Sequence, residues 1–375
     1  MKFICGKDNL NYFLNIALKG VSTRTTLPIL KGIKVSCVAG DNKVSMYSSD
    51  IDISIETSAP ALVEEGGEIV VSAKLFSDIV REMPFGQITF ELRDDNKVFL
   101  SCENSEFDIQ GISSDQFPVM DRDVEGSSFF LEKLMFRDMI KMSAFSASLE
   151  EARGIITGVL FEIEDDEISL VALDGFRMAI VREKIQGGLE GKMIIPSRIV
   201  GEIGKVLFDM EGDESDNVKV IFGENRAKFV INETTIVTKL MEGEFIKYKE
   251  ILPKENKITI KVNKKELEES VRRSSIIVRE GKNAFIKFKI DGNYLVVSSR
   301  ADEGTNKDII DIEKMGEDLE IGFNGRFIND VLKIIPDESI IMKFSTSISP
   351  CIICSEKGDK YTYLILPVRL STANV

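Results

Sequence analysis

The chain of 375 residues contains no histidine. Without histidine there is no Ser/His or Cys/His nucleophile pair, and the most common metal ligand of proteins is missing. The five cysteines are scattered and odd in number, which does not favour a disulfide framework. Cys351 and Cys354 form a CxxC pair, but it lies in the strand-like segment SPCIICS without a second pair, which argues against a zinc or redox site.

Phosphate loops and clustered carboxylates are missing as well. QGGLEGKM lacks both the first glycine and the Ser/Thr of a phosphate loop. Asp174 lies three residues before Arg177, but no metal-spaced carboxylates or general base accompany the pair. We therefore expect no catalytic residue, no metal and no cofactor, and an enzyme of unknown type is the least favoured class.

Long hydrophobic runs are also absent. The first residues, MKFICGKDNLNYF, hold no apolar segment long enough for a signal peptide, and no later run approaches a membrane span. Hydrophobic residues make up 43% of the chain and charged residues 29%, which is typical of a folded globular protein. We expect a cytoplasmic protein of two or three domains that does not contact a membrane.

The sequence contains an internal repeat of roughly 125 residues that occurs in three tandem copies. Each copy opens with a strand leading into an amphipathic helix: KFICGKDNLNYFL, FFLEKLMFRDMI and ITIKVNKKELEESV. A hairpin with an acidic turn follows, then a second strand and helix, then two or three alternating strands. We expect an α+β fold in which each copy has two helices packed on antiparallel sheets of about eight strands.

The boundaries between copies fall near Gly126 and 253–256, where turn residues and charges interrupt the pattern. We predict three domains of one kind, 1–125, 126–253 and 254–375. Three tandem copies suggest rotational pseudo-symmetry rather than a single catalytic centre. If two chains pair head to tail, the surfaces that join successive copies also close a ring.

The charge is distributed unevenly. The formal net charge is −14, which at first sight argues against a nucleic-acid binder. However, the six predicted helical segments sum to +5, so strands and turns carry −19. Helices often carry lysine on their solvated faces, which would give the same excess of positive charge on helices. Charge alone does not exclude this simpler interpretation. In the alternative, the twelve helices of a dimer line a hole of roughly 25–30 Å that passes a duplex, with weak phosphate attraction and no base reading.

Five motifs carry a resemblance to a known family: STRTTLPIL (22–30), LDGFRMA (173–179), EGEFIKYKEILP (242–253), EIGFN (320–324) and LPVRL (366–370). In this order and at this spacing, the whole chain resembles the bacterial DNA polymerase III beta subunits, the sliding clamps. The resemblance implies a head-to-tail homodimeric ring whose helices line a central hole around double-stranded DNA. Implied partners are the DNA polymerase III alpha subunit, the clamp loader and other proteins with a clamp-binding motif.

The resemblance also implies a partner-peptide pocket between the second and third copies, which an extended segment with apolar anchors enters. The matching positions are Ile156, Leu173, Gly175, Phe176, Arg177, Met178, Ile246, Ile251, Ile348, Leu364, Leu366, Pro367, Val368, Arg369 and Leu370. Arg177 is expected at the polar rim. The chain departs from the family's usual His at Phe176, Pro at Ile246 and Arg at Glu250, and STANV trails LPVRL.

Two further sets of residues complete the expectations. DNA-facing positions are Arg24, Lys74, Arg153, Arg198, Lys205 and Arg326. The dimer interface is expected to join Phe107 and Ile109 of one chain to Ile276 and Ile277 of the other. A buried helix end would also explain SSIIV. The leading hypothesis is a non-catalytic processivity ring, and the alternative is a repeat-built scaffold that binds peptides without encircling DNA.

Overall fold

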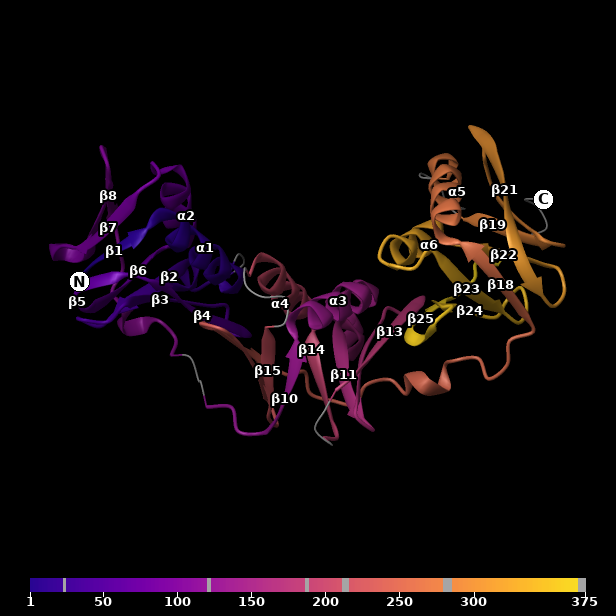
Figure 1. The fold of residues 1–375 in the computed structure, drawn as a ribbon, viewed down its shortest axis with the longest axis horizontal. Coiled ribbons are helices and arrows are strands. Elements are labelled where there is room, and N and C mark those ends of the chain that lie inside the picture. The colour runs from indigo at the N-terminus through magenta and orange to yellow at the C-terminus, as the bar shows by residue number, and fades with distance from the viewer. Residues whose placement is uncertain (23–24, 120–122, 186–188, 211–215, 279–284, 370–375) are drawn as a thin grey trace. The chain divides into compact units, whose positions relative to one another are not determined.

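We analysed a computed structural model, which describes residues 1–22, 25–119, 123–185, 189–210, 216–278 and 285–369. Within these ranges the predicted order recurs three times: a strand, a helix, a hairpin-containing group of strands, a second helix and three closing strands (Figure 1). All six predicted helices are present. The α+β prediction is therefore confirmed at the level of elements.

The first copy has two helices and nine strands. Its elements are β1 (Lys2–Gly6), α1 (Lys7–Ala17), β2 (Gly32–Cys37), β3 (Lys43–Ser49), β4 (Ile53–Pro60), β5 (Leu62–Glu65), β6 (Gly67–Ser72), α2 (Ala73–Glu82), β7 (Gln87–Leu92), β8 (Lys97–Cys102) and β9 (Ser105–Gln110). Leu10, Leu14 and Ala17 recur on one face of α1 and are buried, because an amphipathic helix turns its apolar stripe to the core.

The second copy has the same plan in the residues that the structure describes. Its elements are β10 (Ser127–Glu132), α3 (Lys133–Ser143), β11 (Gly158–Glu164), β12 (Glu167–Leu173), β13 (Arg177–Lys184), β14 (Gly191–Pro196), α4 (Ser197–Asp209), β15 (Asn217–Phe222), β16 (Arg226–Ile231) and β17 (Thr234–Lys239). Helix α3 ends at Ser143, and the chain then tightens into a 3-10 turn at Ala144–Ser146.

The third copy repeats this plan again. Its elements are β18 (Ile258–Asn263), α5 (Lys264–Ile277), β19 (Ile286–Asp291), β20 (Tyr294–Ala301), β21 (Gly304–Met315), β22 (Leu319–Phe323), α6 (Gly325–Leu332), β23 (Ser339–Phe344), β24 (Cys351–Ser355) and β25 (Gly358–Ile365). Asn263 caps the start of α5, since its side chain accepts a hydrogen bond from the backbone N–H of Glu266 at 3.1 Å.

Strand pairing repeats with the sequence. The opening strand of each copy pairs antiparallel with the strand after its second helix: β1 with β7, β10 with β15 and β18 with β23. The copies themselves are joined by antiparallel strands. We call the pairing of β4 with β17 the first joint and the pairing of β13 with β25 the second joint.

By internal contacts the chain forms two compact units rather than three. One comprises Met1–Arg137 with Gly201–Leu240, and the other comprises Asp138–Val200 with Met241–Val375. The sheet of the second copy is thus divided: β10 and β15–β17 extend the first copy's sheet, while β11–β14 extend the third's. Each joint therefore lies inside one unit. Each unit also has its own helix pair on its sheets, α1 with α2 and α5 with α6 (Figure 1).

Candidate functional site

The motif LDGFRMA forms a tight turn between β12 and β13. The Asp174 carboxylate (Oδ1) accepts hydrogen bonds from the backbone N–H groups of Phe176, at 2.8 Å, and Arg177, at 3.0 Å. Gly175 has a φ of 89°, a left-handed conformation that glycine adopts without a side-chain clash. The Asp-Gly pair therefore makes the turn and starts β13 at Arg177.

The guanidinium of Arg177 lies inside the second unit, and its expected place at an open polar rim is wrong. Its Nε donates to Asp174 at 3.0 Å and its Nη1 to Asp330 of α6 at 2.7 Å, while Nη2 donates to the carbonyl oxygen of Phe145 at 3.0 Å. The rings of Phe145 and Phe327 lie 5.2 and 4.8 Å from its central carbon. Only 9% of the side chain is exposed. Arg177 thus links β13 to α6 and to the 3-10 turn Ala144–Ser146, which we call the 145 segment.

Beside this network the second joint carries a cluster of aliphatic side chains. Leu173, Met178 and Leu364 are buried in one cluster, because the antiparallel register sets Met178 opposite both Leu173 and Leu364. Ile156 and Leu366 are half-buried and pack against it. Five of the residues predicted for the pocket are therefore brought together from segments up to about two hundred residues apart.

Residues 366–369 of the LPVRL motif continue past β25 and are held by two backbone hydrogen bonds. Leu366 donates to the carbonyl oxygen of Phe176 at 2.9 Å, and Val368 donates to that of Gly322 at 2.8 Å. The segment is thus fixed between the 174–176 turn and β22. Pro367 is half-buried, whereas Val368 and Arg369 are exposed.

Phe176 is half exposed and is the aromatic edge of this site. Its ring stacks on that of Phe327, with centroids 6.2 Å apart and planes at 23°. The guanidinium of Arg153 lies 5.7 Å from the Phe176 centroid and donates to the carbonyl oxygen of Asp174 at 2.9 Å. The exposed ring of Phe176 therefore gives a stacking surface to Phe327 and to the Arg153 guanidinium.

The segment 245–252 borders the cluster and exposes two isoleucines. Phe245, Tyr248 and Leu252 pack into the cluster, and between them Ile246 is 43% exposed and Ile251 42% exposed. Ile348 lies in the loop between β23 and β24 and is also exposed. We refer to the apolar residues of the second joint and of the segments that border it as the partner surface: Ile156, Leu173, Phe176, Met178, Ile246, Ile251, Leu364, Leu366 and Val368.

A buried carboxylate anchors this segment. Glu162 of β11 is 4% exposed and accepts hydrogen bonds from the Tyr248 hydroxyl, from Lys192 at 2.7 Å and from Lys249 at 3.0 Å. Burial by itself would raise the pKa of Glu162, but the three hydrogen bonds outweigh it and lower that pKa. The charged form is therefore the one that the folded protein stabilises.

This lowered pKa predicts an acid-sensitive contribution to stability. A carboxylate with a lower pKa in the folded than in the unfolded state stabilises the fold above its unfolded pKa, about 4.3 for glutamate, and the contribution is lost as pH falls through the folded pKa. We expect Glu162→Gln to melt at a lower temperature than the parent at pH 7, and to lose less stability on acidification. Thermal melts at neutral and acid pH check this; parallel pH profiles would contradict it.

The helix cations predicted to face DNA are exposed side chains. Lys74 lies on α2, Arg198 and Lys205 on α4 and Arg326 on α6, and all four are classed as exposed. Lys205 pairs with Glu202 at 2.8 Å. Arg153 instead contacts the 174–176 turn, as described above. Arg24 lies outside the described residues, as do Leu370 and the STANV tail.

The residues predicted for the dimer interface lie at two places in the chain. Phe107 is 39% exposed on β9, whereas Ile109 of the same strand is buried. Ile276 is 57% exposed at the end of α5, and Ile277 beside it is half-buried. Within the described residues, β9 pairs along its length with β8 alone, and the 304–311 part of β21 pairs with β20 alone. Each of these strands leaves an edge free.

Sequence reasoning missed the groups that hold the site in shape. The position of Asp174, three residues before Arg177, was a local signal from which their ion pair could have been predicted. The contacts of Asp330, Phe145 and Phe327 with Arg177 could not be predicted, because they form only when α6 and the 145 segment pack on β13. Among the described residues, no cluster of three or more potential ligands could hold a metal ion, and no helix is long and apolar enough to span a bilayer.

The comparisons with known proteins cover nearly the whole chain. Residues 1–121, 131–247 and 249–369 match the family models of the N-terminal, central and C-terminal domains of the DNA polymerase III beta subunit. A beta sliding clamp of Staphylococcus epidermidis is 29% identical over 98% of this chain and 99% of its own length.

Solved structures agree with these matches. The chain is similar to the DNA polymerase sliding clamp of Bacillus subtilis, with a TM-score of 0.93 and 29% identity over 99% of this chain and all of that one. The DNA polymerase III beta subunit of Thermotoga maritima gives a TM-score of 0.92 and 28% identity, again over 99% and 100%.

Proposed function

The chain belongs to the family of DNA polymerase III beta subunits, the sliding clamps, and we propose that two copies close head to tail around duplex DNA and tether partner proteins through the partner surface. DNA sliding clamp function follows from family membership, and the scaffold that does not encircle DNA is not favoured. We propose that 1–125, 126–253 and 254–375 are the three repeated domains of each chain in this assembly.

The observation that carries the ring proposal is the pattern of joints. A hairpin strand of the first copy, β4, pairs with the last strand of the second copy, β17. The equivalent strand of the second copy, β13, pairs with the last strand of the third, β25. The equivalent strand of the third copy is β21, and the last strand of the first copy is β9. Both have free edges within the described residues, so a second chain completes the series.

Affinity for DNA then comes from enclosure rather than from contact energy. The exposed Lys74, Arg198, Lys205 and Arg326 supply weak attraction to phosphates on helices, without side chains that read bases. An overall charge of −14 keeps other surfaces from binding DNA.

Loading on nicked circular DNA, followed by linearisation of the circle, tests the enclosure. We expect the loaded protein to be retained on the circle and to slide off the ends within minutes of linearisation, because no contact holds it at one sequence. A linear DNA with both ends blocked by a bound protein is the control and should retain it. Retention that is the same on open linear DNA and on circles would contradict enclosure.

The partner surface is proposed to bind an extended segment of the DNA polymerase III alpha subunit. Buried Leu173, Met178 and Leu364 make its floor, and the exposed Ile246 and Ile251 supply anchors that leave water on binding. An aliphatic surface of this kind selects partner segments by apolar side chains at alternate positions.

Replacing both Ile246 and Ile251 by serine is expected to weaken binding of the purified alpha subunit about 10- to 100-fold, since each lost aliphatic contact is worth about 1 kcal/mol. Both side chains are already partly exposed, so the melting temperature should hardly change. Surface plasmon resonance on the full-length proteins measures the affinity. Phe85→Ser, which removes another exposed apolar side chain, is the matched control. Equal affinities for all three proteins would remove this segment from the partner surface.

A further inference from the structure

The chain that leads into β18 is long and nearly without secondary structure. Residues 241–257 hold one regular element, the 3-10 turn Tyr248–Glu250. Ordered segments of this length without helices or strands are uncommon and usually carry function. Among residues 241–257, all of which the structure describes, Tyr248 alone is buried. Tyr248 is therefore the main side-chain anchor of this stretch.

Tyr248 is also the backbone centre of the two exposed isoleucines. Its N–H donates to the carbonyl oxygen of Ile246 at 2.6 Å, and its carbonyl oxygen accepts a hydrogen bond from the N–H of Ile251 at 3.1 Å. The N–H of Glu250 donates to the carbonyl oxygen of Lys247 at 3.0 Å and closes the turn between them. A displacement of Tyr248 would therefore displace Ile246 and Ile251 with it.

The Tyr248 side chain is held by the Glu162 carboxylate described above. The hydroxyl donates to Glu162 Oε2, which also accepts from Lys249 at 3.0 Å, while Lys192 binds Oε1 at 2.7 Å. A hydrogen bond to a charged acceptor is roughly twice as strong as one between neutral groups. The Tyr248 ring packs in the aliphatic cluster of the second joint. Hydroxyl and ring thus fix this residue together.

The carboxylate of this anchor is not repeated in the other copies. By strand register, Ser36 of the first copy and Lys289 of the third correspond to Glu162, because each lies opposite the same position of the strand that leads into the second helix of its copy. Neither residue offers a negatively charged acceptor. The charged acceptor of Tyr248 therefore belongs to the copy that contributes the 174–176 turn to the partner surface.

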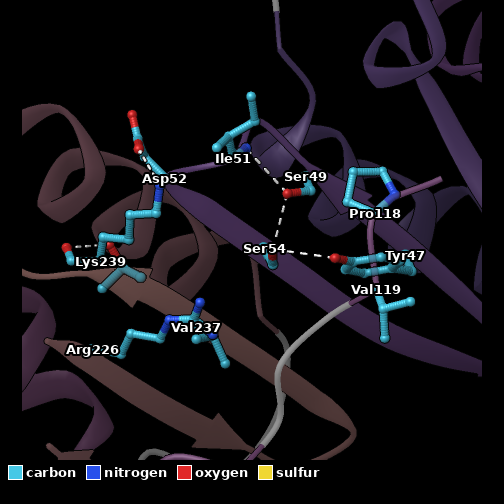
Figure 2. Close-up of a pocket in the computed structure, with 11 residues that line it drawn as sticks. Tyr47, Ser49, Ile51, Asp52, Ser54, Pro118, Val119, Arg226, Val237 and Lys239 are labelled. Carbon is cyan, nitrogen blue, oxygen red and sulfur yellow. Dashed lines mark hydrogen bonds and ion pairs between the residues drawn. The ribbon is translucent and has the colours of Figure 1, made fainter. Parts of the chain in front are cut away.

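The tyrosine of the anchor is not repeated in the first copy either. In sequence, FPVM (117–120) corresponds to FIKY (245–248), and both opening phenylalanines pack at their joint. A methionine, which has no hydroxyl, thus corresponds to Tyr248. Pro118 and Val119 line a pocket at the first joint whose floor carries hydroxyl groups (Figure 2). The pairing of a buried tyrosine with a buried carboxylate thus accompanies the partner surface.

We propose that Tyr248 and Glu162 are positioning residues for partner binding, and that their hydrogen bond holds the 245–252 segment where Ile246 and Ile251 contact the incoming chain. The proposal rests on the proposed function of the partner surface. It adds two groups that do not touch the partner, since each is only 4% exposed. Without the hydrogen bond the segment spends part of its time in other positions, and the affinity falls with the fraction that stays competent to bind.

Tyr248→Phe removes the hydroxyl and keeps the ring. We expect it to bind the purified alpha subunit about tenfold more weakly than the parent in surface plasmon resonance, as if the segment were competent about a tenth of the time. The matched control is Tyr361→Phe, because Tyr361 is 1% exposed and donates its hydroxyl to the Asp337 carboxylate of the same unit. Tyr361→Phe should lower the melting temperature to a similar extent and leave the affinity unchanged.

Three further measurements separate positioning from a general loss of structure. Added to the Ile246→Ser, Ile251→Ser double variant, Tyr248→Phe should change the affinity by less than about twofold, since it acts through the two isoleucines. Glu162→Gln should weaken binding about threefold, because an amide oxygen still accepts the hydroxyl but carries no charge. In methyl NMR of the free protein, the Ile246 and Ile251 signals should shift or broaden with Tyr248→Phe and not with the Tyr361 control.

Equal affinity of Tyr248→Phe and the parent would overturn the proposal. A loss of affinity that Tyr361→Phe shares would overturn it as well, as would a full tenfold loss in the double-serine background. In these cases a weakly binding double-serine variant would still support the partner surface itself. A double-serine variant that binds as the parent does would instead overturn the proposed function, and this proposal with it.

Discussion

Replacing Arg177 by alanine is expected to lower the free energy of unfolding by about 3 kcal/mol, because it removes the guanidinium nearest to both the Asp174 and the Asp330 carboxylates and leaves Asp330 only the exposed Arg326, 3.9 Å away. Asp174 and Asp330 both pair with this guanidinium, at 3.0 and 2.7 Å. The figure is at the low end for a buried ion pair, since Asp330 is 28% exposed and water replaces part of the lost interaction. For a unit of this size the melting temperature should fall by roughly 6–12 °C.

Thermal unfolding of the purified variant measures this loss. Arg326→Ala is the matched control, because that arginine is 76% exposed on the same helix as Asp330 and should change stability by less than about 0.5 kcal/mol. Combining Arg177→Ala with Asp330→Ala should cost less than the sum of the single changes, since the pair is coupled. An Arg177→Ala variant as stable as the parent would show that the guanidinium does not hold the turn.

Replacing Ile276 by aspartate is expected to convert the dimer to monomers. Ile276 is 57% exposed in the single chain, so the change costs the isolated chain little. In the proposed ring it would put an unpaired carboxylate into an interface, which costs several kcal/mol and raises the dissociation constant at least about 100-fold. The effect acts twice, because a head-to-tail ring of two chains has two identical interfaces.

Sedimentation at micromolar concentration measures this outcome. Ile348→Asp places the same charge at an isoleucine that is 71% exposed elsewhere in the second unit, and it should remain dimeric. An Ile276→Asp protein that is dimeric at micromolar concentration would place the contact between chains elsewhere. For Ile276→Asp we expect sedimentation as a monomer together with an unchanged melting temperature.

The repeat could be predicted because it is local. Each amphipathic helix and each acidic hairpin has its signal within a short stretch, and Asp165 and Asp166 adopt the left-handed conformation that the predicted turn requires. Periodicity and turn chemistry are carried by neighbouring residues, so a single sequence is enough to reveal them.

The environment of Arg177 could not be predicted, because its partners are distant in sequence. Asp330 is separated from it by 153 residues. An arginine between two apolar residues in a strand is equally compatible with an exposed side chain and with a buried, ion-paired one. Only the packing of α6 on β13 determines which of the two applies to Arg177. The same holds for Glu162 and Tyr248, which lie 86 residues apart.

The Arg177 network has a consequence for the entropy of partner binding. Three segments, β13, α6 and the 145 segment, are held together in the free protein by one side chain, and LPVRL is held by backbone hydrogen bonds on both sides. The partner surface is therefore ordered in advance, and the ordering cost of association falls on the incoming segment. Cyclic or otherwise constrained ligands should consequently gain more affinity here from stiffening than from added contacts.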